Sequence, residues 1–180
     1  QIGALIEGGV DAILIETVFD TLNAKAAIDA SLAEMDKVGK KLPVMISMTV
    51  SDMAGRTLSG QTIEAFVATI SAYPVFSVGL NCSFGPDKMK PFLREMARCS
   101  HLYVSAYPNA GLPNSMGQYD VGPEELAYQM LDIVKEFNRI TYTQLSNSGF
   151  YLRTQLSRRI HLQFSLRMPT QNTCKDVYRH

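Results

Sequence analysis

Cys82 is the residue of this sequence whose type and position are best suited to chemistry. It follows Asn81 and the apolar run at residues 76–80, so it stands where a predicted buried strand ends and a loop begins. The thiolate form of cysteine is a nucleophile and a metal ligand, whereas a buried cysteine can also be a small packing residue. The residues leave both interpretations open, because zinc needs further ligands and the chain has no Cys-x-x-Cys or His-x-x-x-His pair.

Glu16 is the second candidate, because it follows Ile13, Leu14 and Ile15 at the end of the first predicted strand. A carboxylate at that position can hold a substrate ammonium group through a charge-assisted hydrogen bond. It can also end the strand in solvent, and the pattern slightly favours this. The polar loops at residues 51–60 and 108–111 could bind an anion or close over a site, and ordinary surface loops account for them equally well.

The other cysteines and histidines are not expected to join Cys82. Cys99 and His101 come just before the fourth apolar run, at the opposite end of the predicted sheet, so a packing role is expected for Cys99. The third cysteine and the two other histidines lie beyond residue 138.

Four apolar runs alternate with four amphipathic helical patterns along the chain. The runs lie at residues 12–15, 43–50, 76–80 and 102–107. The helical stripes comprise Ala24, Ala27, Ile28, Ser31, Leu32 and Met35, then Ile63, Phe66, Val67 and Ile70, then Met89, Phe92, Leu93, Met96 and Ala97, and last Leu126, Met130, Ile133, Val134 and Phe137. Apolar strands separated by amphipathic helices predict a parallel sheet covered by helices.

Local signals set the expected limits of two of these helices. Asp20 or Thr21 can cap the start of the first helix, and Gly39 can close its end. Pro91 would interrupt an established helix, so the third helix is expected to begin near Lys90, after a looser turn.

The long polar segments all follow strands, as they do on the functional face of a (β/α) barrel or of an open doubly wound sheet. No glycine-rich dinucleotide fingerprint occurs between strand and helix, which favours the barrel. Four strand–helix units make half of an eight-stranded barrel, which needs about 250 residues. The predicted fold class is therefore α/β, a partial (β/α)8 TIM barrel.

Composition limits the class of protein. Apolar residues make up 46% of the 180 residues, charged residues 19%, and the mean hydropathy is −0.01, as in soluble globular proteins. No apolar run reaches the roughly 18 residues of a membrane-spanning helix, and a net charge of zero gives nucleic acid no electrostatic attraction. The three cysteines do not form a disulfide framework and no export signal is recognised, so a cytoplasmic location is expected.

Residues 138–180 differ in composition from the rest of the chain. From residue 139 onward there are seven basic residues and one acid, a net charge of +6, so the preceding residues carry −6. This segment is rich in Ser, Thr, Gln and Arg and shows no clear period. We therefore expect two parts, a partial barrel at residues 1–137 and a divergent, irregular basic tail at residues 138–180.

Four segments together resemble a known family. They are Ile15-Glu16-Thr17-Val18-Phe19-Asp20-Thr21, Gly55-Arg56-Thr57-Leu58-Ser59-Gly60-Gln61, Gly79-Leu80-Asn81-Cys82 and Pro108-Asn109-Ala110-Gly111-Leu112-Pro113-Asn114. In this order and spacing they resemble the homocysteine-binding barrel of cobalamin-dependent methionine synthases, from residue 1 to about 137 and over that barrel's strands four to seven. The betaine–homocysteine methyltransferases share the barrel and the Asn-Cys pair, but the first two segments fit the methionine synthases better.

The resemblance implies a zinc ion held by three cysteine thiolates, with the homocysteine sulfur at the open fourth position. Cys82 matches the first zinc ligand, Asn81 matches a residue that approaches the metal or substrate, and Glu16 matches the carboxylate that binds the homocysteine amino group. The implied reaction moves a methyl group from methylcobalamin, and ultimately from methyltetrahydrofolate, to homocysteine to form methionine.

The sequence also departs from that family. It has no adjacent cysteine pair to complete the zinc site, and nothing in it corresponds to strands one to three or to the folate, cobalamin and activation modules. The chain is therefore expected to be a fragment that is inactive alone. The alternatives are a non-enzymatic half-barrel that binds a partner, a related betaine or S-methylmethionine–homocysteine methyltransferase, and a complete small α/β binding domain.

Overall fold

The computed structural model describes residues 1–111, 113–117, 119, 121–136, 140–144 and 151–152. In chain order the elements are α1 (Ile2–Glu7), β1 (Ile13–Val18), α2 (Thr21–Val38), β2 (Val44–Met48), α3 (Ile63–Ile70), β3 (Ser77–Asn81), α4 (Pro86–Cys99), β4 (Tyr103–Tyr107), α5 (Pro123–Glu136), β5 (Ile140–Gln144) and β6 (Tyr151–Leu152). They confirm the predicted alternation of four strands, β1 to β4, with four helices, α2 to α5. Within the described residues no helix is both long and apolar enough to span a bilayer.

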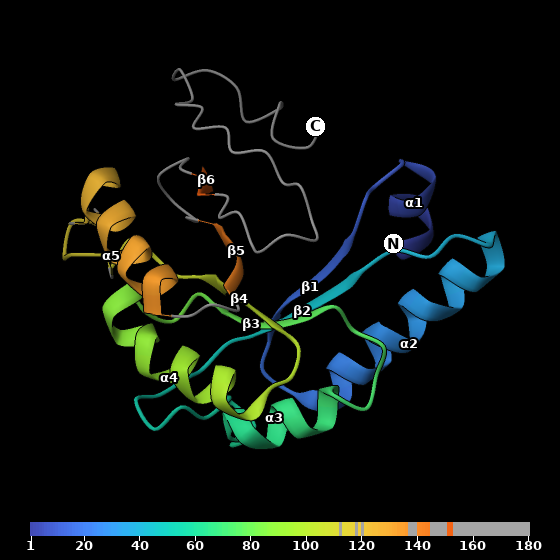
Figure 1. The fold of residues 1–180 in the computed structure, drawn as a ribbon, viewed down its shortest axis with the longest axis horizontal. Coiled ribbons are helices and arrows are strands. Elements are labelled where there is room, and N and C mark those ends of the chain that lie inside the picture. The colour runs from blue at the N-terminus through green and yellow to red at the C-terminus, as the bar shows by residue number, and fades with distance from the viewer. Residues whose placement is uncertain (112, 118, 120, 137–139, 145–150, 153–180) are drawn as a thin grey trace.

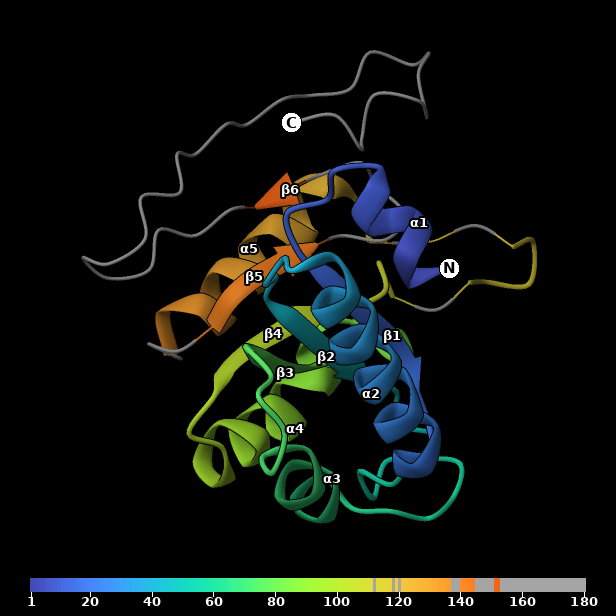
Figure 2. The same cartoon turned by 90° about the vertical axis from the view of Figure 1, so that its right-hand side faces the viewer.

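The sheet follows the order of the chain. Strands β1 to β5 are parallel and each pairs with the next, and β6 is antiparallel to β5. Helices α2, α3, α4 and α5 form an arc around one face of this sheet (Figure 1), and the second view again places α3 and α4 on that side (Figure 2). The carboxyl ends of the parallel strands therefore lie along one edge.

The core lies between the helices and the sheet face that they cover. It contains alternate strand residues and most of the predicted helical stripes, with the fully buried Ile28, Ile46, Met48, Ile63, Phe66, Ile70, Leu80, Met89, Leu93, Met96 and Leu126 among its largest side chains. Of the predicted stripe residues, Ala27 and Val134 are partly exposed and Phe137 lies outside the described residues. Side chains alternate between the two faces along a strand, so Ser47, Ser77 and Ser105 lie on the opposite face. Their hydroxyl groups are buried and have no hydrogen-bond partner among the described residues.

Helix α2 begins and ends at the predicted caps. The Asp20 side chain accepts hydrogen bonds from the amide groups of Leu22 and Asn23, at 2.7 Å and 3.3 Å. Gly39 follows the helix with φ of 65°, a left-handed conformation that glycine adopts without steric cost. Asp20 and Gly39 therefore define the length of this helix from within the sequence.

The expected start of α4 near Lys90 is wrong. The helix begins at Pro86, with Gly85 as its N-cap, and continues through Pro91. Pro86 occupies the first helical position, where no amide hydrogen is needed, and Pro91 removes a single backbone hydrogen bond near the start of the helix. Burial of one continuous face, including Met89 and Phe92, offsets that loss.

Strand β5 begins in the segment where the sequence shows no clear period. Ile140 pairs with Val104, and Tyr142 and Thr143 pair with Ser105 and Ala106 of β4. β-Branched and aromatic residues favour strands, and here tertiary pairing selects that conformation. Apart from β5 and β6, the predicted tail at residues 138–180 lies outside the described residues.

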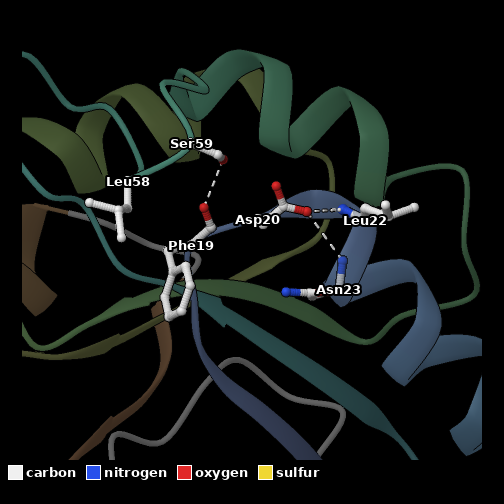
Figure 3. Close-up of a pocket in the computed structure, with 6 residues that line it drawn as sticks. All are labelled: Phe19, Asp20, Leu22, Asn23, Leu58 and Ser59. Atoms are coloured by element: carbon white, nitrogen blue, oxygen red, sulfur yellow. Dashed lines mark hydrogen bonds between the residues drawn. The ribbon is translucent and has the colours of Figure 1, made fainter.

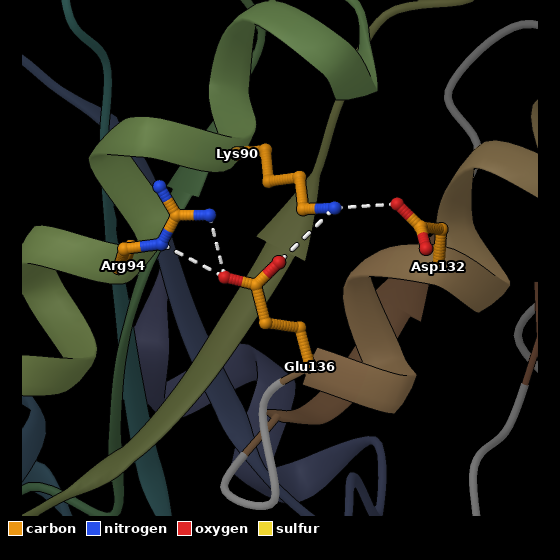
Figure 4. A network of polar contacts seen from close by, with 4 residues as sticks. All are labelled: Lys90, Arg94, Asp132 and Glu136. Atoms are coloured by element: carbon orange, nitrogen blue, oxygen red, sulfur yellow. Dashed lines mark hydrogen bonds and ion pairs between the residues drawn. The ribbon is translucent and has the colours of Figure 1, made fainter.

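Ion pairs on the protein surface join α4 to α5 (Figure 4). Lys90 binds Asp132 and also Glu136, the latter at 3.0 Å, and Arg94 donates to Glu136 at 2.6 Å and 2.8 Å. The hydrogen bond from Lys90 holds the pKa of Asp132 below its usual 3.8, and Arg94, with Lys90, holds the pKa of Glu136 below its usual 4.5. The hydrogen bond to Asp132, together with the weaker effect of the hydrogen bond to Glu136, raises the pKa of Lys90 above 10.5.

Replacing Glu136 tests this network. The Glu136→Gln change removes the carboxylate shared by Lys90 and Arg94, so amide hydrogen exchange in the last turns of α5 should accelerate. A lowered folded-state pKa contributes stability that is complete above the ordinary pKa and is lost as the pH falls through the lowered one. The difference should therefore persist at neutral pH and fade as the pH falls below 4.5 and 3.8. High salt should also reduce it. Glu95→Gln on α4 is the control, and equal exchange in the two variants would contradict the network.

Gly79 in β3 is required by the neighbouring strand. A Cβ atom at this position would lie 2.1 Å from Ser105 Oγ and 2.6 Å from the Ser105 carbonyl oxygen. The Gly79→Ala variant should therefore lose about 3 kcal/mol of unfolding free energy, the upper end of overpacking effects, as measured by urea denaturation. Gly122→Ala is the control, since nothing lies within 4 Å of its Cβ position, and it should cost about 1 kcal/mol or less. Equal denaturation midpoints would contradict this account.

Candidate functional site

The four segments that resemble the known family, at residues 15–21, 55–61, 79–82 and 108–114, are called the resemblance segments. They are distant in sequence and meet at the carboxyl edge of the sheet. The first covers the end of β1 and the connection to α2, the second follows β2, the third ends β3 and the fourth follows β4. Parallel pairing in chain order brings these four strand ends to the same edge. Active sites of parallel α/β folds occupy this edge.

Asn81, the last residue of β3, connects this strand to β1. Its side-chain oxygen accepts a hydrogen bond from the Thr17 amide group at 2.9 Å, and its side-chain nitrogen donates to Thr17 Oγ1 at 2.8 Å. The same nitrogen donates to Cys82 Sγ at 3.2 Å. Asn81 is 3% exposed. The Asn81 side chain thus bonds to the sulfur of the next residue, Cys82, and also holds the peptide that follows Glu16 beside it.

A β-bulge in β1 shapes the position of Glu16. Two residues of β1, Glu16 and Thr17, face a single residue of β2 between the paired positions. Thr17 has φ of 59°, which is unusual for a β-branched residue. Bulges often re-aim side chains next to active sites. Glu16 is exposed, and its position after Ile15 places it on the sheet face opposite the helices, the face that also carries Asn81.

Cys82 also lies in an unusual backbone segment. Cys82 and Ser83 both have positive φ, 57° and 64°. The Cys82 amide group donates to the carbonyl oxygen of Tyr107 at 3.0 Å, and Ser83 Oγ donates to the carbonyl oxygen of Val50. Left-handed conformations of residues other than glycine persist where surrounding contacts impose them, and they cluster at functional sites. Cys82 is partly exposed and belongs to no disulfide among the described residues.

A second amide side chain holds the other end of the same segment. Gln61 Oε1 accepts from the Thr21 amide group at 3.1 Å, and Gln61 Nε2 donates to Thr21 Oγ1 at 2.6 Å. Ser59 Oγ donates to the Phe19 carbonyl oxygen at 2.8 Å. The loop after β2 is thus fastened to the connection between β1 and α2, in the same manner as Asn81 is fastened to Thr17.

The fourth segment contacts the third. The Asn109 amide group donates to the Phe84 carbonyl oxygen at 3.0 Å, and a Cβ atom on Gly85 would lie 3.4 Å from Gly111. The loop after β4 therefore packs against the turn that follows Cys82. Leu112 lies outside the described residues.

The described pocket at this edge lies beside the candidate residues and does not include them. It measures about 440 Å³ and is lined by Phe19, Asp20, Leu22, Asn23, Leu58 and Ser59 (Figure 3). Leu22 and Leu58 are 74% and 73% exposed, so the pocket is shallow. Neither Glu16 nor Cys82 lines it, and the Asp20 carboxylate serves mainly as the helix cap.

The described residues supply a single thiol to a metal at this edge. They contain no group of three or more His, Cys, Asp or Glu side chains able to hold a metal ion. Cys99 is distant in the fold, at the end of α4 beneath β4, and packs against the core. Burial raises the pKa of the Cys99 thiol, which agrees with the predicted packing role. The residues present thus do not complete a tetrahedral zinc site.

Sequence reasoning did not identify Thr17, Thr21 or Gln61 as residues that shape the site, although Thr21 is a candidate helix cap. All three belong to the resemblance segments, but neither segment by itself indicates which residue of the other it contacts. An amide side chain beside a threonine is a weak signal, because both residue types are common in polar loops.

The contact between Gln61 and Thr21 can be tested by proteolysis. Arg56 is exposed in the loop after β2, so trypsin can report on the mobility of this loop. Gln61→Leu removes both hydrogen bonds to Thr21, and cleavage after Arg56 should accelerate severalfold. Gln129→Leu is the control, since the Gln129 side chain donates a hydrogen bond to Glu125 within α5. Unchanged cleavage after Arg56 in Gln61→Leu would show that the loop is held by other contacts.

Known structures share this arrangement of elements. The apo form of the Escherichia coli homocysteine methyltransferase MmuM has a TM-score of 0.55 and 18% identity, with 80% of this chain and 47% of that chain covered. Its metallated form gives 0.50 and 20%, covering 80% and 42%. A Pseudomonas aeruginosa protein described as a dihydrodipicolinate synthetase gives 0.54 and 17%, covering 82% and 48%. At these identities the likeness shows the fold alone, and the chain spans about half the length of each structure.

A sequence-family comparison is more specific. The family model of homocysteine S-methyltransferase matches residues 1–142 of the 180. The match includes all four segments at the carboxyl edge and extends five residues past the expected boundary at 137, into β5. The chain therefore belongs to the homocysteine S-methyltransferase family.

Proposed function

We propose that residues 1–137 form about half of a (β/α)8 barrel and carry part of a homocysteine site. In this site Cys82 is one of the thiolate ligands of a zinc ion, and Glu16 holds the amino group of homocysteine. The observation that carries the proposal is the contact of Asn81 with both Thr17 and Cys82. It brings the carboxylate-bearing end of β1 and the thiol after β3 to one place.

The curvature of the sheet supports the barrel. Strands β1 and β3 are separated by β2, and on a flat sheet they would be about 9.6 Å apart. An asparagine side chain and one hydrogen bond do not reach that far. The bonds from Asn81 to Thr17 therefore require the sheet to curve away from the helices, toward the face that would be the inside of a barrel.

The unpartnered serines support the same conclusion. Ser47, Ser77 and Ser105 present buried hydroxyl groups on the concave face, and buried polar groups normally have partners. In a barrel the interior is filled by layers of side chains from all its strands. In a complete barrel, side chains from the other half would provide the hydrogen bonds that these serines lack.

The methyl donor follows from the resemblance rather than from the geometry. The segments at residues 15–21 and 55–61, which fit the cobalamin-dependent methionine synthases best, contact each other through Thr21 and Gln61. We propose methylcobalamin as donor, with the folate and cobalamin modules belonging to a longer enzyme. Zinc would stabilise the thiolate form of homocysteine when bound. With one thiolate instead of three, the chain is expected to bind zinc weakly and to be inactive alone.

Nuclear magnetic resonance of the ¹⁵N-labelled chain tests the site. Excess zinc should shift the amide signals around Cys82, and L-homocysteine added afterwards should extend the shifts to Glu16. L-homoserine, which has oxygen in place of sulfur, should not. Cys82→Ser should abolish the zinc response, and Cys99→Ser is the matched control. Zinc shifts centred on Cys99, or a homocysteine response that does not require zinc, would refute the proposal.

An activity assay tests the expected inactivity. Demethylation of methylcobalamin or of S-methylmethionine by homocysteine and zinc should be no faster when the chain is present than when it is absent. Methionine formation that depends on Cys82 would show that the chain is active alone, and the donor consumed would identify the reaction.

A further inference from the structure

We propose that Asn81 is a positioning residue and not a ligand of the substrate: both N–H donors of its buried side-chain amide, and one lone pair of its oxygen, fix Thr17 and Cys82 relative to each other. This inference rests on the proposed function only in assigning Glu16 and Cys82 to one site. It differs from the expectation that Asn81 itself approaches the substrate.

The hydrogen-bonding capacity of the amide is the first argument. An asparagine side chain has two N–H donors and one carbonyl oxygen with two lone pairs. The two donors are directed to Thr17 Oγ1 at 2.8 Å and to Cys82 Sγ at 3.2 Å. The oxygen accepts from the Thr17 amide group at 2.9 Å. No donor is left for a substrate carboxylate or sulfur.

The orientation of the amide is fixed as well. The backbone N–H of Thr17 can only donate, so the side-chain oxygen of Asn81 must face it. The nitrogen then faces Thr17 Oγ1 and Cys82 Sγ. Since Asn81 is 3% exposed, substrate cannot reach the amide without breaking these bonds.

The consequence is a defined relation between two reactive groups. Asn81 fixes the peptide between Glu16 and Thr17 and the rotamer of the adjacent thiol through a single rigid plane. Thr17 and Cys82, the two residues it contacts, both have positive φ, a conformation that neither residue type favours alone. Asn81 therefore sets the separation of the carboxylate and the sulfur, and with it the length of amino thiol that can bridge them.

Gln61 supplies an internal comparison. It makes the same pair of hydrogen bonds to the amide and hydroxyl groups of Thr21, in the same segment, but no sulfur contact is described for it. Changes at Gln61 and Thr21 therefore control for loosening of the segment without loss of the bond to sulfur.

Side-chain amide signals of the full ¹⁵N-labelled chain test the assignment. Thr17→Val should shift one of the two Asn81 Nδ2 protons, and Cys82→Ala should shift the other. Thr21→Val, the matched control, should shift the Gln61 amide protons only. If neither Asn81 proton responds to Thr17→Val or Cys82→Ala, and both exchange with water as fast as those of the exposed Asn23, the proposal is wrong.

Cadmium binding tests the consequence for the sulfur. In a background with Cys99 and Cys174 replaced by serine, the sulfur-to-cadmium charge-transfer absorption reports on Cys82 alone. Asn81→Ala should weaken cadmium binding by roughly 10- to 100-fold, as loss of a partner to a metal ligand does. It should also move the band to longer wavelength, because the thiolate loses an N–H donor. Gln61→Ala should change neither the cadmium affinity nor the wavelength of the band. If Asn81→Ala shows the same affinity and wavelength as Gln61→Ala, the proposal is overturned.

Both measurements omit homocysteine and methyl donors, so their outcome is independent of whether the proposed function holds. A third arm adds L-homocysteine to the zinc-loaded chain. If Asn81 is a positioning residue, its Nδ2 protons remain sensitive to Thr17→Val and Cys82→Ala in the presence of homocysteine. If homocysteine replaces Thr17 or Cys82 as their acceptor, Asn81 is a substrate ligand and the inference fails.

Discussion

The hydrogen bonds of Asn81 are the constraint on which the site depends. They connect strand ends that are 64 residues apart and that have another strand between them. They form where Thr17, in the β-bulge and with a left-handed backbone, turns its amide group toward β3, and the curvature that we propose for the sheet brings the two strands within reach. Curvature, bulge and thiol position are therefore one linked feature, and a change in any of them would move Glu16 and Cys82 apart.

The connection between β1 and α2 is held at both of its ends by the same chemistry. Asn81 binds Thr17 and Gln61 binds Thr21, each through an amide that matches the backbone N–H and the hydroxyl of one threonine. Such paired bonds restrain orientation as well as distance. They explain why resemblance segments widely separated in sequence belong together: the residues of one segment satisfy the hydrogen bonds of another. Loops on a rigid scaffold acquire fixed geometry in this way.

Much of the fold could be predicted from the sequence, because it depends on local patterns. The helical stripes, the caps Asp20 and Gly39, and the order of strands and helices agree with the structure. The start of α4 could not be predicted, since burial of a helix face outweighed the effect of Pro91. Strand β5 could not be predicted either, because its pairing with β4 supplies the order that its short sequence lacks. The untested boundary between barrel and tail remains a prediction.

The sequence by itself determined which residues could do chemistry. The apolar runs predict that Cys82 follows one strand and that Glu16 lies near the end of another, because the spacing of apolar residues reflects which side chains are buried. Only the tertiary structure decided which of them meet, and through what. The roles of Thr17 and Gln61 and the hydrogen bonds of the Asn81 amide depend on positive φ angles and on contacts across strands. Such contacts are set by the curvature of the whole sheet, which no single segment encodes.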